Sequence, residues 1–227
     1  MQYHYYLVQN YTTLGFHKVR APPEMMTILS KFWKRQFTSL TNDRDVEINS
    51  LPNEMWSRGD TYTNHWSSPT KLVSLTDSSS RKILWESSKT ILEQWTGVQL
   101  SPSSMYGVRI YTNGSVLAPH VDRTPLIISA VVNVAQDVDE DWPLEVYGRD
   151  GKAYNLTLEA GEMILYEGHS VIHGRPFPLK GRYYAVSVGV EDERLFLSRL
   201  TECDATHIQH FYLPNYLFRI YSYISNH

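Results

Sequence analysis

Three side chains that could hold one metal ion lie in the middle of the chain. His120 and Asp122 are two residues apart, and on a β-strand this spacing puts both side chains on one face, since successive side chains alternate. His173 would reach the same ion from a distant strand. Two imidazoles and one carboxylate on one side of a metal leave the opposite positions open, as in non-haem Fe(II) sites. The residue types and their order therefore predict an open iron site.

A basic residue follows the second histidine by about the length of one hairpin. Arg182 stands at the start of the apolar run Tyr183 to Val190. A guanidinium there could bind the far carboxylate of a dicarboxylic co-substrate through two hydrogen bonds. The alternative for Arg182 is a salt bridge at a strand end. His169 competes with His173 as the distal ligand, and the position relative to Arg182 favours His173.

These motifs resemble those of the 2-oxoglutarate- and Fe(II)-dependent dioxygenases, most closely the prolyl 4-hydroxylase-like branch. The resemblance covers residues 104–191 and includes the HxD pair, His173 and the triplet Gly181-Arg182-Tyr183. It implies that His120, Asp122 and His173 are the iron ligands and catalytic centre, and that Arg182 anchors 2-oxoglutarate. It also implies use of O₂, release of succinate, and ascorbate as an optional reductant.

Supporting residues are suggested by the same resemblance. Tyr111 stands where relatives place a tyrosine that lines the co-substrate pocket, with core packing as its alternative. Where several relatives have a tyrosine that assists the co-substrate carboxylate, this chain has Asn133 or nothing. Tyr184 stands where the plant-type branch has a serine. Five further residues could face a substrate opening: Arg109, Arg123, Trp142, Tyr166 and Arg175.

The resemblance implies a hydroxylase acting on prolyl residues of a peptide or protein. A hydroxylase of a free amino acid or small metabolite is the enzymatic alternative. From another class, the alternative is a non-catalytic jelly-roll module that binds a metal or ligand. A purely structural metal site would fill the coordination positions with protein ligands, whereas this sequence offers three well-placed ones.

Composition bounds the class of protein. The chain has 227 residues and a net charge of −3, which argues against a general nucleic-acid binder, because phosphate binding needs concentrated Lys and Arg. Its one cysteine excludes an internal disulfide and a cysteine-based zinc site. We see no signal peptide and no apolar run of membrane-spanning length, so the sequence favours a cytoplasmic protein without membrane contact.

The pattern of elements predicts one mainly β domain with flanking helices. Residues 1–100 form an N-terminal helical support region, with helices after Pro22 and over about 81–95 and a polar stretch at 41–80 that could cover the site as a lid. Residues 104–191 contain short strands separated by regular turns, which predicts a double-stranded β-helix, or jelly roll. The expected strands are 105–111, 116–122, 126–135, 142–147, 153–158, 162–166, 171–173 and 183–190. Residues 192–227 form a helical, aromatic tail that could support a homodimer contact.

Overall fold

Two antiparallel sheets form the centre of the computed structural model, which describes residues 9–38, 70–122 and 126–189. The large sheet has the strand order β1-β8-β5-β10-β3-β2 and the small sheet the order β4-β9-β6-β7. The helices are α1 (Pro23–Thr38) and α2 (Ser78–Thr96). The strands are β1 (Phe16–Arg20), β2 (Lys71–Ser74), β3 (Met105–Thr112), β4 (Leu117–His120), β5 (Ser129–Val138), β6 (Leu144–Tyr147), β7 (Ala153–Leu156), β8 (Glu162–Tyr166), β9 (His173–Arg175) and β10 (Gly181–Gly189).

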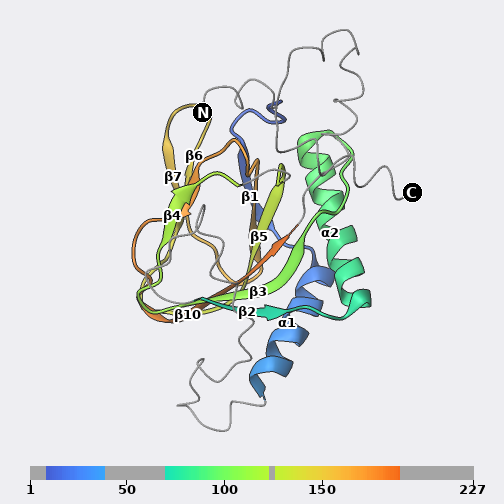
Figure 1. The fold of residues 1–227 in the computed structure, drawn as a ribbon, viewed down its shortest axis with the longest axis vertical. Helices are drawn as coiled ribbons and strands as arrows, with labels where there is room; N and C mark the ends of the chain where they lie inside the picture. Colours follow the sequence, from blue (N-terminus) through green and yellow to red (C-terminus); the bar gives the residue numbers. More distant parts are fainter. Residues whose placement is uncertain (1–8, 39–69, 123–125, 190–227) are drawn as a thin grey trace, which may run out of the picture. The chain divides into compact units, whose positions relative to one another are not determined.

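Side chains along the central strands point alternately to the two faces of the large sheet, and they contribute to two separate apolar cores. On β5, Val132 and Val134 pack with the helices, whereas Val131 points into the space between the sheets. Figure 1 shows α1 and α2 on one side of the large sheet and the small sheet on the other. Burying each such side chain contributes about 1.5–3 kcal/mol. The predicted mainly β jelly roll with flanking helices is therefore confirmed, and the apolar run in β5 reflects a strand that is covered on both faces.

Local sequence sets the ends of α2. Asp77 is the N-cap, where its carboxylate accepts a hydrogen bond of 2.9 Å from the backbone N–H of Ser80. Gly97 ends the helix in the left-handed region at φ 74°, and its N–H donates to the Glu93 carbonyl. Glycine is favoured there because it has no Cβ penalty. The helix thus begins three residues before the expected Arg81, because the first turn is capped by Asp77 rather than by the serines.

Several element boundaries differ from those predicted. β2 lies within the stretch expected to be irregular, where it pairs with β3 as an edge strand of the large sheet and buries Leu72 and Val73. β4 ends at His120 instead of continuing to Asp122, and β9 continues to Arg175 instead of ending at His173. The remaining lid region (41–69) and the aromatic tail with its dimer contact lie outside the described residues. The lid, the dimer and the single-domain organisation therefore stay predictions.

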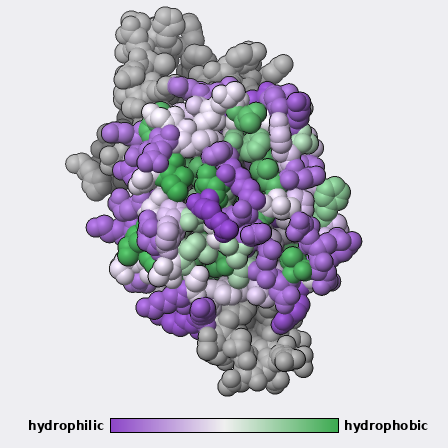
Figure 2. Space-filling model, turned by 180° about the vertical axis from the view of Figure 1, so that it is seen from behind, coloured by the Kyte–Doolittle hydropathy of each residue, from purple (hydrophilic) through white to green (hydrophobic). Residues whose placement is uncertain are grey.

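One face of the described part of the molecule is mostly polar. Figure 2 shows one face on which hydrophilic side chains predominate and hydrophobic patches are small and scattered. Neither α1 nor α2, the helices of the described residues, is long and apolar enough to cross a membrane. Five large apolar side chains of the described part are exposed: Leu14, Ile83, Tyr147, Ile172 and Phe177.

A buried carboxylate ties the start of the chain to the end of β8. Glu167 is fully buried and accepts hydrogen bonds from the backbone N–H groups of Tyr11 and Thr12 at 3.0 and 2.9 Å. Arg149 binds both of its oxygens, at 2.7 and 2.5 Å. The Glu167 N–H also donates to the Gly15 carbonyl. Such a pair is costly to break, because removing one partner leaves the other charge buried and uncompensated.

Replacing this carboxylate should destabilise the protein. We expect Glu167→Gln to lower the free energy of unfolding by about 2–4 kcal/mol, measured by urea denaturation. Glu140→Gln removes a carboxylate whose ion pair with Lys180 is exposed, and it should leave the urea midpoint unchanged. Equal losses in both variants would contradict the special role of Glu167.

The same carboxylate predicts a pH dependence. Burial acts to raise the pKa of Glu167, but hydrogen bonds from Arg149 and Thr12 outweigh it and hold the pKa below the ordinary value of 4.5. A group with a lowered folded-state pKa stabilises the fold above its unfolded pKa and loses this contribution as the pH falls. The stability gap between wild type and Glu167→Gln should therefore be full above pH 4.5 and shrink in more acidic urea titrations. A gap that widens with acid would refute this assignment.

Candidate metal centre

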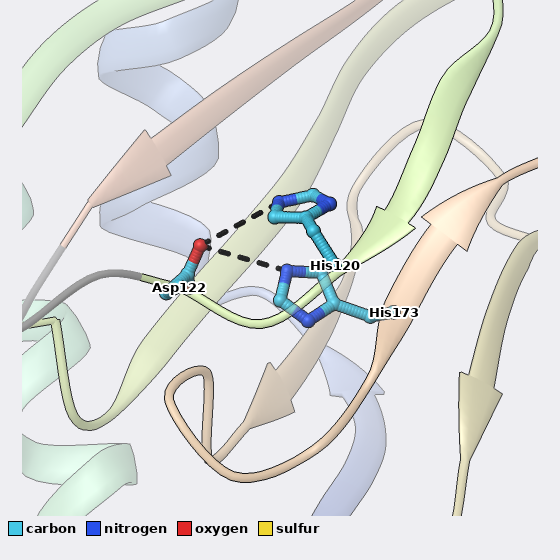
Figure 3. A group of neighbouring side chains, drawn as sticks. All are labelled: His120, Asp122 and His173. Atoms are coloured by element: carbon cyan, nitrogen blue, oxygen red, sulfur yellow. Dashed lines mark ion pairs between the residues drawn. The ribbon is translucent and has the colours of Figure 1, made fainter. Parts of the chain in front are cut away.

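Two imidazoles meet where the strands β4 and β9 pair. His120, the last residue of β4, lies opposite His173, the first residue of β9. Their ring centroids are 4.5 Å apart, and Figure 3 shows both rings directed toward Asp122. His173 is 3% exposed and also packs against Tyr166, at 4.4 Å between ring centroids. The antiparallel pairing thus brings together two histidines that are far apart in the sequence.

Backbone carbonyls fix the orientation of both imidazoles. The Nδ1 atom of His120 lies 2.8 Å from the Ala118 carbonyl, and that of His173 lies 2.9 Å from the Val171 carbonyl. A carbonyl oxygen can only accept a hydrogen bond, so each Nδ1 carries the proton in the neutral ring. Each Nε2 therefore presents its lone pair to the centre, and a carbonyl of this kind is a usual support for a metal-binding histidine.

Asp122 enters the centre from the segment just after β4. Its N–H donates to the Gly168 carbonyl at 2.7 Å, and its Oδ2 accepts a hydrogen bond of 3.2 Å from Ser129. Its Oδ1 lies 3.7 Å from the Nε2 atoms of both His120 and His173. The expectation that Asp122 shares a strand with His120 was wrong, because β4 ends at His120 and the Asp122 N–H binds the Gly168 carbonyl beyond the strand. The two side chains nevertheless converge.

Burial and charge favour the protonation states that bind a metal. Burial, together with nearby His173, lowers the pKa of His120, so the neutral imidazole is favoured. Burial acts to raise the pKa of Asp122, but His173 and His120 outweigh it and lower this pKa below its ordinary value. A neutral imidazole and an ionised carboxylate are the ligand forms that a divalent metal needs.

The three residues fit a divalent metal such as iron. Oδ1 of Asp122 lies 3.7 Å from Nε2 of each histidine, which is within the roughly 4.2 Å that can separate two atoms bound to one ion at about 2.1 Å. Within the described residues, the cluster contains three side chains of the His, Cys, Asp or Glu type. Two histidines and one carboxylate suit Fe(II) and leave positions for other ligands. His169 stays outside the cluster, where its Nδ1 lies 3.2 Å from the Ile127 carbonyl.

Four other expected site residues lie inside or beside the space between the sheets. Tyr111, Trp142 and Tyr166 are buried there, so Trp142 and Tyr166 do not face an opening. The indole N–H of Trp142 donates to the Phe177 carbonyl at 2.7 Å. Arg109 is half-buried and close enough to His120 to help lower the pKa of that imidazole. Arg123 lies outside the described residues.

The structure does not place Arg182 and Asn133 as expected for co-substrate binding. The Arg182 side chain is 61% exposed and donates to Asp137 at 3.0 Å. A register shift in β10 between Gly181 and Tyr183 leaves Arg182 unpaired with β5, and such a bulge redirects a side chain. Asn133 is buried, but its amide N–H groups already donate to Gln136 and the Leu158 carbonyl. It therefore has no free donor for a carboxylate.

Sequence reasoning gave no role to two residues that support the centre, Gly168 and Ser129. It also placed Arg175 at an opening, whereas the structure buries this side chain between the sheets, with 2% exposed. The missed signal was alternation, because Arg175 is two residues after His173 and shares its strand face.

The fold and the three side chains can be compared with known proteins. The described part combines an antiparallel double-stranded β-helix with two histidines and one carboxylate, a donor set that suits non-haem Fe(II). No family model matches the sequence, and no curated protein matches it. The fold itself is similar to solved structures of prolyl hydroxylases and of a 2OG-Fe(II) oxygenase family protein.

Three solved structures illustrate the likeness. One is a prolyl hydroxylase from Trichoplax adhaerens in complex with a peptide fragment of the hypoxia inducible factor oxygen degradation domain, with TM-score 0.56, 12% identity and coverage of 79% of this chain and 84% of that one. A second is a prolyl-4-hydroxylase from Pseudomonas putida, with a TM-score of 0.53 and 13% identity; the match covers 80% of this chain and 94% of that one. The third is AviO1 from Streptomyces viridochromogenes, with a TM-score of 0.54 and 12% identity; the match covers 80% of this chain and 91% of that one. At these identities the likeness establishes the fold.

A close glycine contact makes the centre testable. A Cβ atom added at Gly168 would lie 2.2 Å from Oδ2 of Asp122 and 3.0 Å from the Ser129 hydroxyl. Gly168→Ala should therefore push the Asp122 carboxylate aside and weaken metal binding by about tenfold to a hundredfold, measured by anaerobic Fe(II) titration. Gly97→Ala, where a Cβ meets nothing within 4 Å, should leave metal affinity unchanged. Unaltered affinity in Gly168→Ala would contradict the geometry.

Proposed function

We propose that this protein is a 2-oxoglutarate- and O₂-dependent Fe(II) hydroxylase. The observation that carries the proposal is the convergence of two oriented Nε2 lone pairs and one carboxylate oxygen between the sheets of a double-stranded β-helix. Bound Fe(II) would supply oxidation of a C–H bond, with O₂ and 2-oxoglutarate consumed and a hydroxylated product, succinate and CO₂ formed. The atoms balance, since one oxygen atom enters the substrate and the other enters succinate.

The chain's own residues have separable tasks in this proposal. His120, His173 and Asp122 hold the metal from one side and leave the other side for ligands. The Ala118 and Val171 carbonyls keep the imidazoles in one tautomer, and Ser129 holds the second carboxylate oxygen. The buried aromatic residues around His173 exclude water from the interior, which strengthens the electrostatic interactions there.

The non-catalytic jelly-roll module remains the competing class. It would fill the remaining coordination positions with protein groups, and the described residues supply three ligands. The module also predicts no O₂ uptake and no succinate, whereas the hydroxylase predicts slow succinate formation even without its substrate. Succinate formation therefore distinguishes the two functions.

Removing a ligand tests the proposal. His173→Ala and Asp122→Ala should lower Fe(II)-dependent succinate formation by more than about a hundredfold, because each removes a metal ligand. His169→Gln is the matched control, since His169 is a nearby, half-buried histidine outside the cluster, and it should retain most of the activity. Wild-type turnover in Asp122→Ala, with the fold verified by circular dichroism, would refute the ligand assignment.

For the substrate, the proposal is a prolyl residue of a peptide or protein. Its support is that two of the similar structures are prolyl hydroxylases and that one of them holds a peptide fragment. Mass spectrometry of proline-containing peptides, incubated with the enzyme, should detect one added oxygen. The same screen with free amino acids tests the small-metabolite alternative. An oxygen added to free amino acids and to none of the peptides would overturn the peptide proposal.

A further inference from the structure

Arg175 is a buried cation without a counter-charge among the described residues. Its side chain lies in the interior with 2% exposed, and its Nη1 donates to the Trp142 carbonyl. The buried Nη2 has no hydrogen-bond partner. Among the described residues, the arginines that form ion pairs with carboxylates are Arg20, Arg149 and Arg182, and Arg175 forms none. An uncompensated buried charge is unfavourable, so an anionic ligand at this point would stabilise the interior.

Aromatic rings enclose the guanidinium. Its Cζ atom lies 4.5 Å from the ring centroids of both Trp142 and Tyr184. Trp142 in turn packs against Tyr111, with 4.9 Å between ring centroids. Stacking of this kind holds the planar group in one orientation and shields it from water. The N–H groups of Nη2, which have no hydrogen-bond partner, are therefore preorganised for a carboxylate.

The distance from the metal centre suits a short dicarboxylate. Arg175 and His173 share one face of β9, and positions two residues apart on a strand are separated by about 6.5 Å. A five-carbon chain with bonds of about 1.5 Å spans about 5 Å. A 2-oxoacid bound to the metal beside His173 could therefore reach the guanidinium with a carboxylate at its far end.

We infer that Arg175, and not Arg182, binds the distal carboxylate of the 2-oxoglutarate co-substrate. This inference rests on the proposed function. Arg182 is 61% exposed and already paired with Asp137, and in water such a pair contributes little. Arg109 is half-buried and has an interaction partner of its own. Arg175 is buried, its Nη2 has no hydrogen-bond partner, and its side chain lies on the same face of β9 as His173.

The experiment compares two keto acids of equal length. 2-Oxoglutarate and 2-oxopentanoate share the end that binds a metal, but only the first has a distal carboxylate. Both are titrated into the full chain loaded with Mn(II), with affinity measured by calorimetry. We expect Arg175→Met to weaken 2-oxoglutarate binding by about tenfold to a hundredfold and to leave 2-oxopentanoate binding unchanged. Arg182→Met, the matched control, should change neither affinity.

Each result bears on the inference separately from the proposed function. Selective loss of 2-oxoglutarate binding in Arg182→Met instead of Arg175→Met would overturn the inference. Equal loss of affinity for both keto acids in Arg175→Met would also overturn it, because that result indicates a merely structural role. Methionine preserves much of the side-chain length between the rings, and Arg175→Lys is a second variant that should fold and keep the preference for 2-oxoglutarate. A wild-type protein that binds Mn(II) but neither keto acid would instead refute the proposed function.

Discussion

The pairing of β4 with β9 is the constraint on which the centre depends. His120 and His173 lie opposite each other only in this register, and a slip of one residue would turn either imidazole to the other face of the small sheet. Both imidazoles then use the same device, a hydrogen bond from Nδ1 to the carbonyl two residues earlier. Strand pairing thus fixes both the position of the rings and the nitrogen that each presents.

The carboxylate ligand depends on a different part of the fold. Asp122 lies beyond β4 and is held by the Gly168 carbonyl. Gly168 follows Glu167, which the N-terminal segment and Arg149 hold from the other side. The buried ion pair and the metal centre are therefore successive contacts of one loop. The N-terminal attachment and the placement of the third ligand therefore use two adjacent residues, Glu167 and Gly168.

Periodic features of this fold could be predicted from the sequence, whereas features that depend on distant contacts could not. The β-branched run in β5 and the stripe of α1 follow from local patterns, so these elements were expected. The HxD pair and His173 also follow from residue type and order. The position of Asp122, however, involves a hydrogen bond to a carbonyl distant in the sequence, and the exposure of Arg182 accompanies a bulge in β10. Neither feature leaves a local signal, so spacing and resemblance together predicted Arg182 as the anchor of the co-substrate.

A buried histidine of the candidate metal centre and a buried arginine lie on one short strand, β9. β9 carries a metal-binding imidazole at its first residue and a guanidinium at its third, with Gly174 between them on the opposite face. A Cβ at Gly174 would lie 2.7 Å from the Cα atom of Pro119, so glycine permits the close approach of β4. β4 also pairs Leu117 with Arg175, and a register shift lies between this pair and the pair His120–His173. Because both residues belong to β9, the strand itself sets the separation between the His173 imidazole and the Arg175 guanidinium, and under the proposed function it would set the length of a ligand that bridges them.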